Sequence, residues 1–149
     1  MSKGRSGESL GPVVRATGRS ELSAEELNAI TGAVIEAAVG IHTRLGPGLL
    51  ESVYEIILAR DLARRGYRVE RQKPVSFEFE GLAFDNAFRV DLIVQSAVIV
   101  EVKSVAVLPP VYEKQVLTYL RLLDLRVGLL LNFAVPLLKQ GIRRIVNGF

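Results

Sequence analysis

Two acidic side chains and a lysine lie on a segment with the pattern of two short strands joined by a tight turn. Asp91 falls in residues 88–94, and Glu101 and Lys103 fall in residues 98–103. If the three intervening residues form the loop, antiparallel pairing places Asp91 opposite Glu101 on one face of the sheet. A shift of one residue in the pairing would separate the two carboxylates onto opposite faces. The pattern therefore predicts a carboxylate pair only for a loop with an odd number of residues.

A carboxylate pair on one sheet face needs a physical reason, because like charges repel and burial makes each charge more costly. A divalent cation removes this conflict, and Mg²⁺ is commonly bound by one or two carboxylates together with water and phosphate oxygens. Lys103 follows Glu101 by two residues and so shares its face, where it can orient a water or offset charge on a phosphate. The alternative is a solvated network in which Asp91 faces Glu101 and Arg89 faces Lys103. The spacing alone leaves both interpretations open.

A second motif adds a resemblance to a known family. Gly48, Glu51 and Tyr54 spell Gly-x-x-Glu-x-x-Tyr, and the sequence here resembles the GxxExxY protein family, a branch of the PD-(D/E)xK nuclease-like superfamily. The resemblance extends over about residues 22–147 and rests on segments 41–54, 70–74, 88–92, 100–103, 115–119 and 126–133. It implies a restriction-endonuclease-like α/β fold with an αβββαβ core, in which helices flank a mixed central sheet.

The resemblance also implies roles for individual residues. The metal ligands would be Asp91, Glu101, the carbonyl of Val102, and Glu51. Lys103 would be the catalytic lysine, and Gln115 would point at the metal or at a substrate phosphate. The residues implied to position substrate are Tyr54, Arg89 and Tyr119. The chain departs from the family at Tyr112, where many members carry His, so a role that needs imidazole there is in doubt.

The apolar periodicity predicts the same order of elements independently. Ser23 and Glu26 form a capping box that starts a helix, and Gly46 ends it. A second helix covers about residues 50–65, with a core-facing stripe of Val53, Ile56, Ile57 and Leu62. The expected later elements are strands at 67–72, 75–79, 88–94 and 98–103, a helix at 111–123, and strands at 126–133 and 142–146. The helix between the last central strands predicts parallel pairing there.

Length and composition limit the remaining classes. The 149 residues suit one domain, expected at 21–149, and the 49% hydrophobic content excludes a chain that is disordered throughout. Residues 1–20 carry four basic and one acidic side chain and several glycines, and we expect a flexible basic tail there. Residues 21–149 carry equal numbers of basic and acidic side chains. The chain has no Cys, which fits a cytoplasmic protein, and no apolar run long enough for a membrane span.

Three functions remain open from the sequence. The first is a nuclease that uses Mg²⁺, with Mn²⁺ as a substitute, to hydrolyse nucleic-acid phosphodiesters, with DNA preferred to RNA as partner. A homodimer would suit such an enzyme, because cutting two strands with one centre per chain needs two chains. The second is a catalytically silent module of the same fold that binds nucleic acid or a protein. The third is a hydrolase or transferase that acts on a small phosphorylated substrate.

Overall fold

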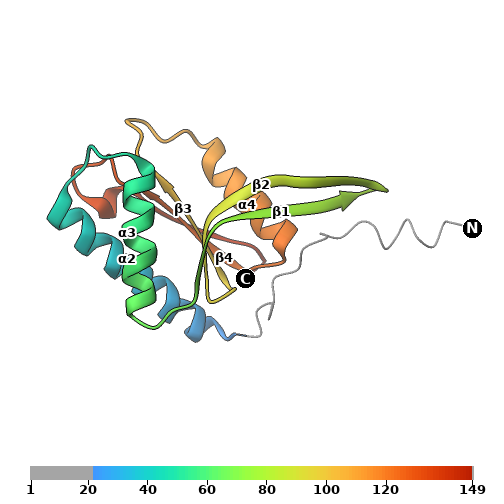
Figure 1. Ribbon diagram of the computed structural model, residues 1–149, viewed down its shortest axis with the longest axis horizontal. Helices are drawn as coiled ribbons and strands as arrows, with labels where there is room; N and C mark the ends of the chain where they lie inside the picture. Colours follow the sequence, from blue (N-terminus) through green and yellow to red (C-terminus); the bar gives the residue numbers. More distant parts are fainter. Residues whose placement is uncertain (1–21, 149) are drawn as a thin grey trace, which may run out of the picture.

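The computed structural model describes residues 22–148, so the tail predicted at residues 1–20 lies outside the described residues. The elements follow the order predicted from the sequence (Figure 1). They are α2 (Ala24–Leu45), α3 (Glu51–Arg64), β1 (Val69–Phe79), β2 (Leu82–Val94), β3 (Val98–Lys103), α4 (Val111–Leu123), β4 (Val127–Asn132), the 3₁₀ helix η1 (Leu138–Gly141) and β5 (Ile142–Val146).

The helix boundaries follow from local chemistry. At the start of α2, the Ser23 hydroxyl accepts from the Glu26 amide at 3.0 Å and the Glu26 carboxylate accepts from the Ser23 amide at 2.8 Å. The helix ends at Gly46, whose φ of 75° is costly for any residue with a Cβ. Within residues 22–148, none of the helices is long and apolar enough to cross a membrane.

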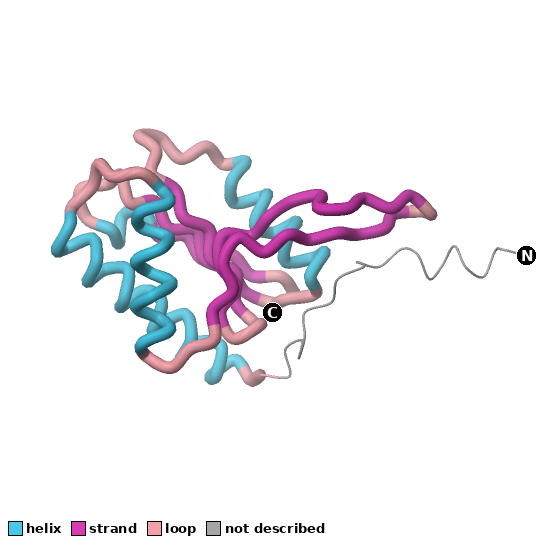
Figure 2. Tube along the Cα trace, viewed as in Figure 1, coloured by secondary structure: helices cyan, strands magenta, loops and turns pink. Residues whose placement is uncertain are grey.

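The sheet has five strands in sequence order, β1-β2-β3-β4-β5. Only β3 and β4 run parallel, because α4 carries the chain back between them, while the other neighbouring pairs are antiparallel (Figure 2). The sheet is therefore mixed and the fold is α/β, as predicted. The parallel pairing predicted for the strand after α4 is confirmed.

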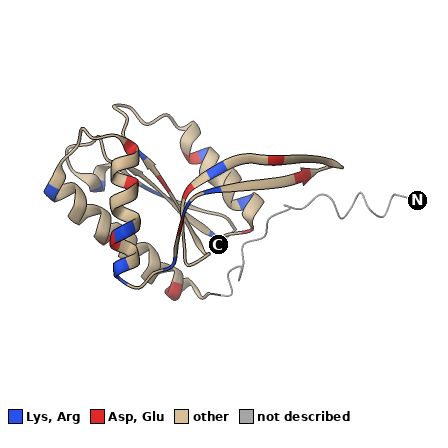
Figure 3. Ribbon diagram, in the orientation of Figure 1, with Lys and Arg blue, Asp and Glu red and all other residues tan. Residues whose placement is uncertain are grey.

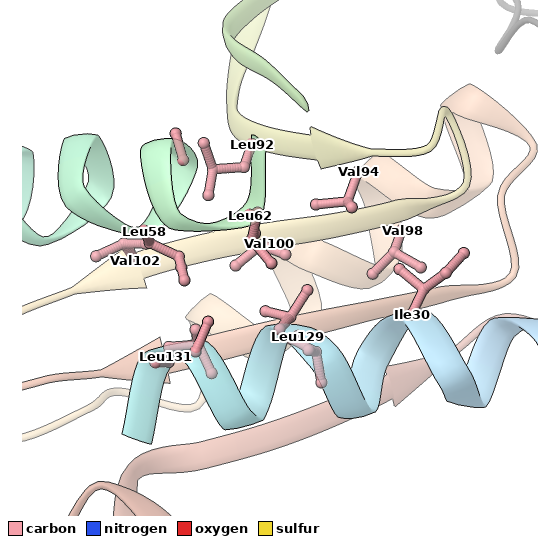
Figure 4. Close-up of a cluster of buried hydrophobic side chains, with 14 of the residues drawn as sticks. Ile30, Leu58, Leu62, Leu92, Val94, Val98, Val100, Val102, Leu129 and Leu131 are labelled. Carbon is pink, nitrogen blue, oxygen red and sulfur yellow. The ribbon is translucent and has the colours of Figure 1, made fainter. Parts of the chain in front are cut away.

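Helices cover both faces of this sheet. On one face, α2 and α3 pack on β2, β3 and β4, and on the other, α4 packs against the opposite side chains of the same strands. Figure 4 shows part of the first cluster, with the labelled side chains Ile30, Leu58, Leu62, Leu92, Val94, Val98, Val100, Val102, Leu129 and Leu131. The strands β3 and β4 are buried on both faces, which explains their almost continuous apolar sequence.

Two details of the predicted elements were wrong. Ile56 does not face the core but is 51% exposed, and the buried apolar residues on either side of it on α3 are Tyr54 and Leu58. The first strand is also continuous through Pro74 instead of ending there. This is possible because β1 is an edge strand, so the amide that proline lacks has no partner to lose on the open side.

The β1–β2 hairpin is longer than the sheet and projects beyond it as an arm (Figure 1). Its tip is a tight turn in which Glu80 and Gly81 have φ values of 50° and 85°. The pairing shifts between Val75 and Phe77, where β2 holds extra residues. This irregularity increases the twist, so that the distal arm diverges from the sheet.

Candidate metal and catalytic centre

The β2–β3 ladder ends just before the predicted carboxylate pair. Ile93 lies opposite Ile99, and the last paired residues are Leu92 and Val100. The register therefore has the odd loop that the carboxylate pair requires. Arg89, which was expected opposite Lys103, lies beyond the end of this ladder, so the predicted pairing of these two residues was wrong.

Where the ladder ends, side chains replace backbone carbonyls as hydrogen-bond acceptors. The Asp91 amide donates to Glu101 Oε2 at 2.9 Å, and the Val102 amide donates to Asp91 Oδ2 at 2.9 Å. Each carboxylate thus binds an amide on the opposite strand. The structure brings Asp91 and Glu101 together, as predicted, and does so through contacts that the sequence did not indicate.

The predicted alternation of β2 fails at Asp91. Leu92 packs with α2 and α3, but Val90 packs in the cluster around α4 instead of sharing the face of Leu92. At the same level of the sheet, Gln72 on β1 has a φ of 49° and lies between the residues that pair with Val90 and Leu92. The β2–β3 pairing also ends at Leu92, so Asp91 lies at the end of this ladder.

Burial dominates the electrostatics of the pair. Glu101 is 4% exposed, and burial, followed by the charge of Asp91, raises its pKa from 4.5 to about 8. Burial also raises the pKa of Asp91, against the opposing effects of the Val102 amide and the charge of Lys103. At neutral pH the metal-free pair therefore retains a proton, and a cation bound between the carboxylates would displace it.

Lys103 lies beside the pair at the end of β3. Its charge lowers the pKa of both Asp91 and Glu101. The Lys103 Nζ atom lies 4.4 Å from the ring centroid of Tyr112 on α4. Tyr112, where this chain departs from the GxxExxY pattern, thus contacts the predicted catalytic lysine.

Glu51 approaches the centre from the first turn of α3. Its Oε2 atom accepts a hydrogen bond from the Ser104 amide at 3.2 Å, and its charge raises the pKa of Asp91. Nevertheless, the described residues contain no group of three His, Cys, Asp or Glu side chains arranged to hold a metal ion. Glu51 is therefore a neighbour of the carboxylate pair, and its role as a ligand stays a prediction.

The other predicted site residues differ in their surroundings. Tyr119 on α4 stacks on Phe88 with ring centroids 4.1 Å apart, and its pKa is raised by burial and then by the charges of Glu101 and Asp91. Gln115, one turn earlier, is half-buried and makes no hydrogen bond within residues 22–148. Both side chains are therefore available on the α4 side of the centre, whereas Arg89 is exposed on β2.

Tyr54 is a structural residue in this fold. Its ring is fully buried and stacks on Phe133 with centroids 4.3 Å apart. Its hydroxyl donates to the Gly46 carbonyl and accepts from the Leu49 amide at 3.2 Å, which fixes the loop before α3. We therefore propose no direct substrate contact for Tyr54, although the loop it fixes determines where Glu51 enters.

The comparison with protein families agrees with this arrangement. A family model described as the PD-(D/E)XK nuclease superfamily matches residues 28–145, which include both helical layers and the sheet. The chain belongs to the PD-(D/E)XK nuclease superfamily. The match confirms the predicted superfamily and does not resolve the narrower GxxExxY resemblance. Comparisons with curated proteins and with solved structures give no match.

This PD-(D/E)XK domain has a second polar cluster that sequence reasoning missed. Glu55 on α3 is 4% exposed, and its two carboxylate oxygens lie 2.9 and 3.0 Å from Gln72 Nε2. The same amide nitrogen lies 3.2 Å from Asp91 Oδ1, and Arg71 Nε donates to Glu55 at 3.2 Å. Gln72 therefore connects Asp91 Oδ1 to Glu55, a buried glutamate whose charge is compensated by Arg71.

A signal for this cluster was present but ambiguous. Glu55 follows Glu51 by one helical turn, so the two carboxylates share a side of α3. Gln72, by contrast, is placed by a positive φ that costs on the order of 1 kcal/mol in a residue with a Cβ. Strain of this kind depends on how β2 leaves β3, which no local pattern in residues 69–79 reveals.

PD-(D/E)XK nucleases generally use divalent metal ions, and the donors of this centre fit one. The half-buried Asp91 and the buried Glu101, both with raised pKa values, provide hard oxygen ligands whose repulsion a cation would remove. Asp91 and Glu101 would hold the ion, with the Val102 carbonyl and Glu51 as the further oxygens in reach of the same strand end. Two carboxylates supplemented by water and phosphate are the coordination that Mg²⁺ commonly accepts.

Proposed function

We propose that this domain is a metal-dependent nuclease of the GxxExxY type that hydrolyses phosphodiester bonds in nucleic acids. Mg²⁺ is the expected ion, Mn²⁺ its substitute, and DNA the expected substrate ahead of RNA. The observation that carries the proposal is the pair of the half-buried Asp91 and the buried Glu101, in which each carboxylate accepts from the other strand's backbone. A fold that needed only stability would place apolar side chains at these two positions.

The residues of the centre divide the chemistry among them. A bound divalent cation would polarise a phosphoryl oxygen and lower the pKa of a bound water. Asp91 and Glu101 supply the negative charge that binds it, and the backbone amides fix the orientation of both carboxylates. Lys103 places a positive charge beside them, where it can orient the attacking water and stabilise the negative charge that develops on the phosphoryl oxygens. Gln115 and Tyr119 can contact the phosphate from the α4 side.

A cleavage assay with purified protein tests the proposal. Single- and double-stranded DNA and RNA are incubated with Mg²⁺ or Mn²⁺, and the wild type is compared with Asp91→Asn, Lys103→Met and the matched surface variant Glu80→Gln. We expect loss of cleavage in the first two and full activity in the third. No cleavage by the wild type with either metal would contradict a nuclease function, and unchanged activity in Asp91→Asn would contradict the assignment of this centre as the catalytic one.

A catalytically silent binding module is the second candidate. It is favoured by the absence, within the described residues, of a preformed group of three metal ligands, and by the zero net charge of residues 21–149. Titration of Mg²⁺ and Mn²⁺ into the wild type and into Asp91→Ala, with and without an oligonucleotide, separates the two candidates. Metal binding that is present in the wild type and lost in Asp91→Ala supports the enzyme. No metal binding by either protein, with or without the oligonucleotide, supports the module. Sedimentation of the same samples tests the proposed homodimer.

A further inference from the structure

A groove lies between α2 and α3 and is lined by residues of both helices. It encloses a cavity of about 350 Å³, and its floor includes Gly40, Ile41 and Ile57. Gly40 faces open space, because a Cβ at this position would meet no atom within 4 Å. The missing side chain therefore leaves the groove deeper at this point. Ile56, which was expected in the core, instead lines this groove and is 51% exposed.

The groove is strongly basic in a chain with little net charge elsewhere. Four arginines and one aspartate line it, whereas residues 21–149 as a whole have no net charge. Arg65 is neutralised by Glu36 and Asp61, at 3.3 and 3.5 Å. The other three arginines are exposed and have no ion pair or hydrogen bond among the described residues: Arg44, Arg60 and Arg64.

The unpaired arginines lie on both helices that flank the groove, Arg44 on α2 and Arg60 and Arg64 on α3. Arg44 lies in the last turn of α2, and the chain then turns directly into α3, whose first residue is Glu51. From Glu51, Arg60 is about 14 Å and Arg64 about 20 Å along the helix axis. Figure 3 shows acidic positions at the start of α3 and basic positions in its later part. Glu51 and Glu55 lie in the first half of the helix, and Arg60, Asp61 and Arg64 lie in its second half. The second half of α3 thus carries a net positive charge, which attracts phosphate.

We propose that the α2–α3 groove binds the phosphate backbone of the nucleic-acid strand whose scissile bond lies at the Asp91–Glu101 centre. This inference rests on the proposed nuclease function and adds a second contact surface to it. Arg60 and Arg64, one helical turn apart, have side chains that emerge about 5–6 Å from each other and can contact neighbouring phosphates. Guanidinium groups bind phosphate in a bidentate manner, and the apolar floor can contact the sugars. Such contacts read no sequence, so the groove supplies affinity rather than base specificity.

The experiment measures how binding depends on strand length. Fluorescent single strands, one short enough to fill only the centre and one long enough to reach Arg64, are titrated in Ca²⁺ or without metal to prevent cleavage. The test variant is Arg60→Gln with Arg64→Gln, and the matched control is Arg121→Gln with Lys139→Gln, which removes two exposed charges elsewhere. Thermal melting of each variant confirms that the fold is retained.

We expect the wild type and the control to bind the long strand more tightly than the short one. The groove variant should lose about five- to fiftyfold in affinity for the long strand only, with a salt slope reduced by about 1.4. Two results would overturn the inference while leaving the nuclease proposal intact. One is an equal loss of affinity for the long strand in the control variant. The other is a groove variant that still binds the long strand more tightly than the short one, to the same degree as the wild type. Preferential binding of polyglutamate over both strands would overturn it in favour of an acidic protein partner. If the wild type binds no nucleic acid, both proposals fail.

Discussion

The raised pKa of Glu101 makes the stability of the metal-free protein depend on pH in a predictable direction. In the folded state Glu101 releases its proton near pH 8, whereas the unfolded chain releases it near 4.5. Between these values the folded state binds more protons than the unfolded state, so the free energy of unfolding falls as pH rises. The stabilisation is complete below the unfolded pKa and is lost as pH passes the folded pKa. At about 1.4 kcal/mol per pH unit, the interval between the two pKa values limits the change in the free energy of unfolding to a value on the order of 5 kcal/mol.

The variant Glu101→Gln removes this dependence while keeping a carbonyl oxygen for the Asp91 amide. Urea unfolding in the presence of a chelator, between about pH 5 and pH 8, measures both proteins, with Glu80→Gln as the exposed control. We expect stability to fall with pH in the wild type and the control, and to be much flatter in Glu101→Gln. Added Mg²⁺ should restore wild-type stability at the alkaline end, because it binds the ionised pair. A flat or rising wild-type profile, or one that the substitution leaves unchanged, would refute the assignment of a buried, protonated Glu101.

Three further substitutions test other contacts. Gln72→Leu leaves Asp91 Oδ1 without its donor, and we expect about tenfold weaker metal binding by calorimetry; unchanged affinity would exclude a positioning role. Tyr54→Phe removes two hydrogen bonds to the loop before α3, so chemical denaturation should show a loss of about 1–2 kcal/mol, and a neutral result would mean that ring stacking alone fixes the loop. Gly128→Ala places a Cβ 2.9 Å from Val116 Cγ1, which should lower stability by about 1–3 kcal/mol; an equally stable variant would show that α4 moves freely.

Much of the fold could be predicted because its signals are local. The capping box at Ser23, the turn at Gly46 and the prolines before α4 each act within a few residues, and the helices begin and end close to the predicted positions. The register of β2 on β3 was also accessible, because the parity of a short loop decides which side chains share a face. Each of these features is determined by residues that are close together in the sequence and does not depend on the rest of the fold.

The remainder depends on long-range packing. The side chains of β2 change faces at Asp91, beside the positive φ of Gln72 on β1, and neither strand shows this in its own pattern. The burial of Glu55 likewise depends on contacts with Arg71 and Gln72, which follow 16 and 17 residues later, respectively. Periodicity therefore located the carboxylate pair, whereas the groups that orient Asp91 required the folded structure.

The divergence of β2 and β3 gives the protein an internal reporter. In an ordinary ladder an amide donates to a carbonyl whose strength as an acceptor does not change with conditions. Here the amides of Asp91 and Val102 donate to carboxylates, whose acceptor strength changes with protonation and with bound cations. Their amide proton chemical shifts and hydrogen-exchange rates should therefore respond together to pH and to metal, while those of Leu92 and Val100 stay nearly constant. Two backbone resonances would then follow the ionisation state of a buried centre without any label or substrate.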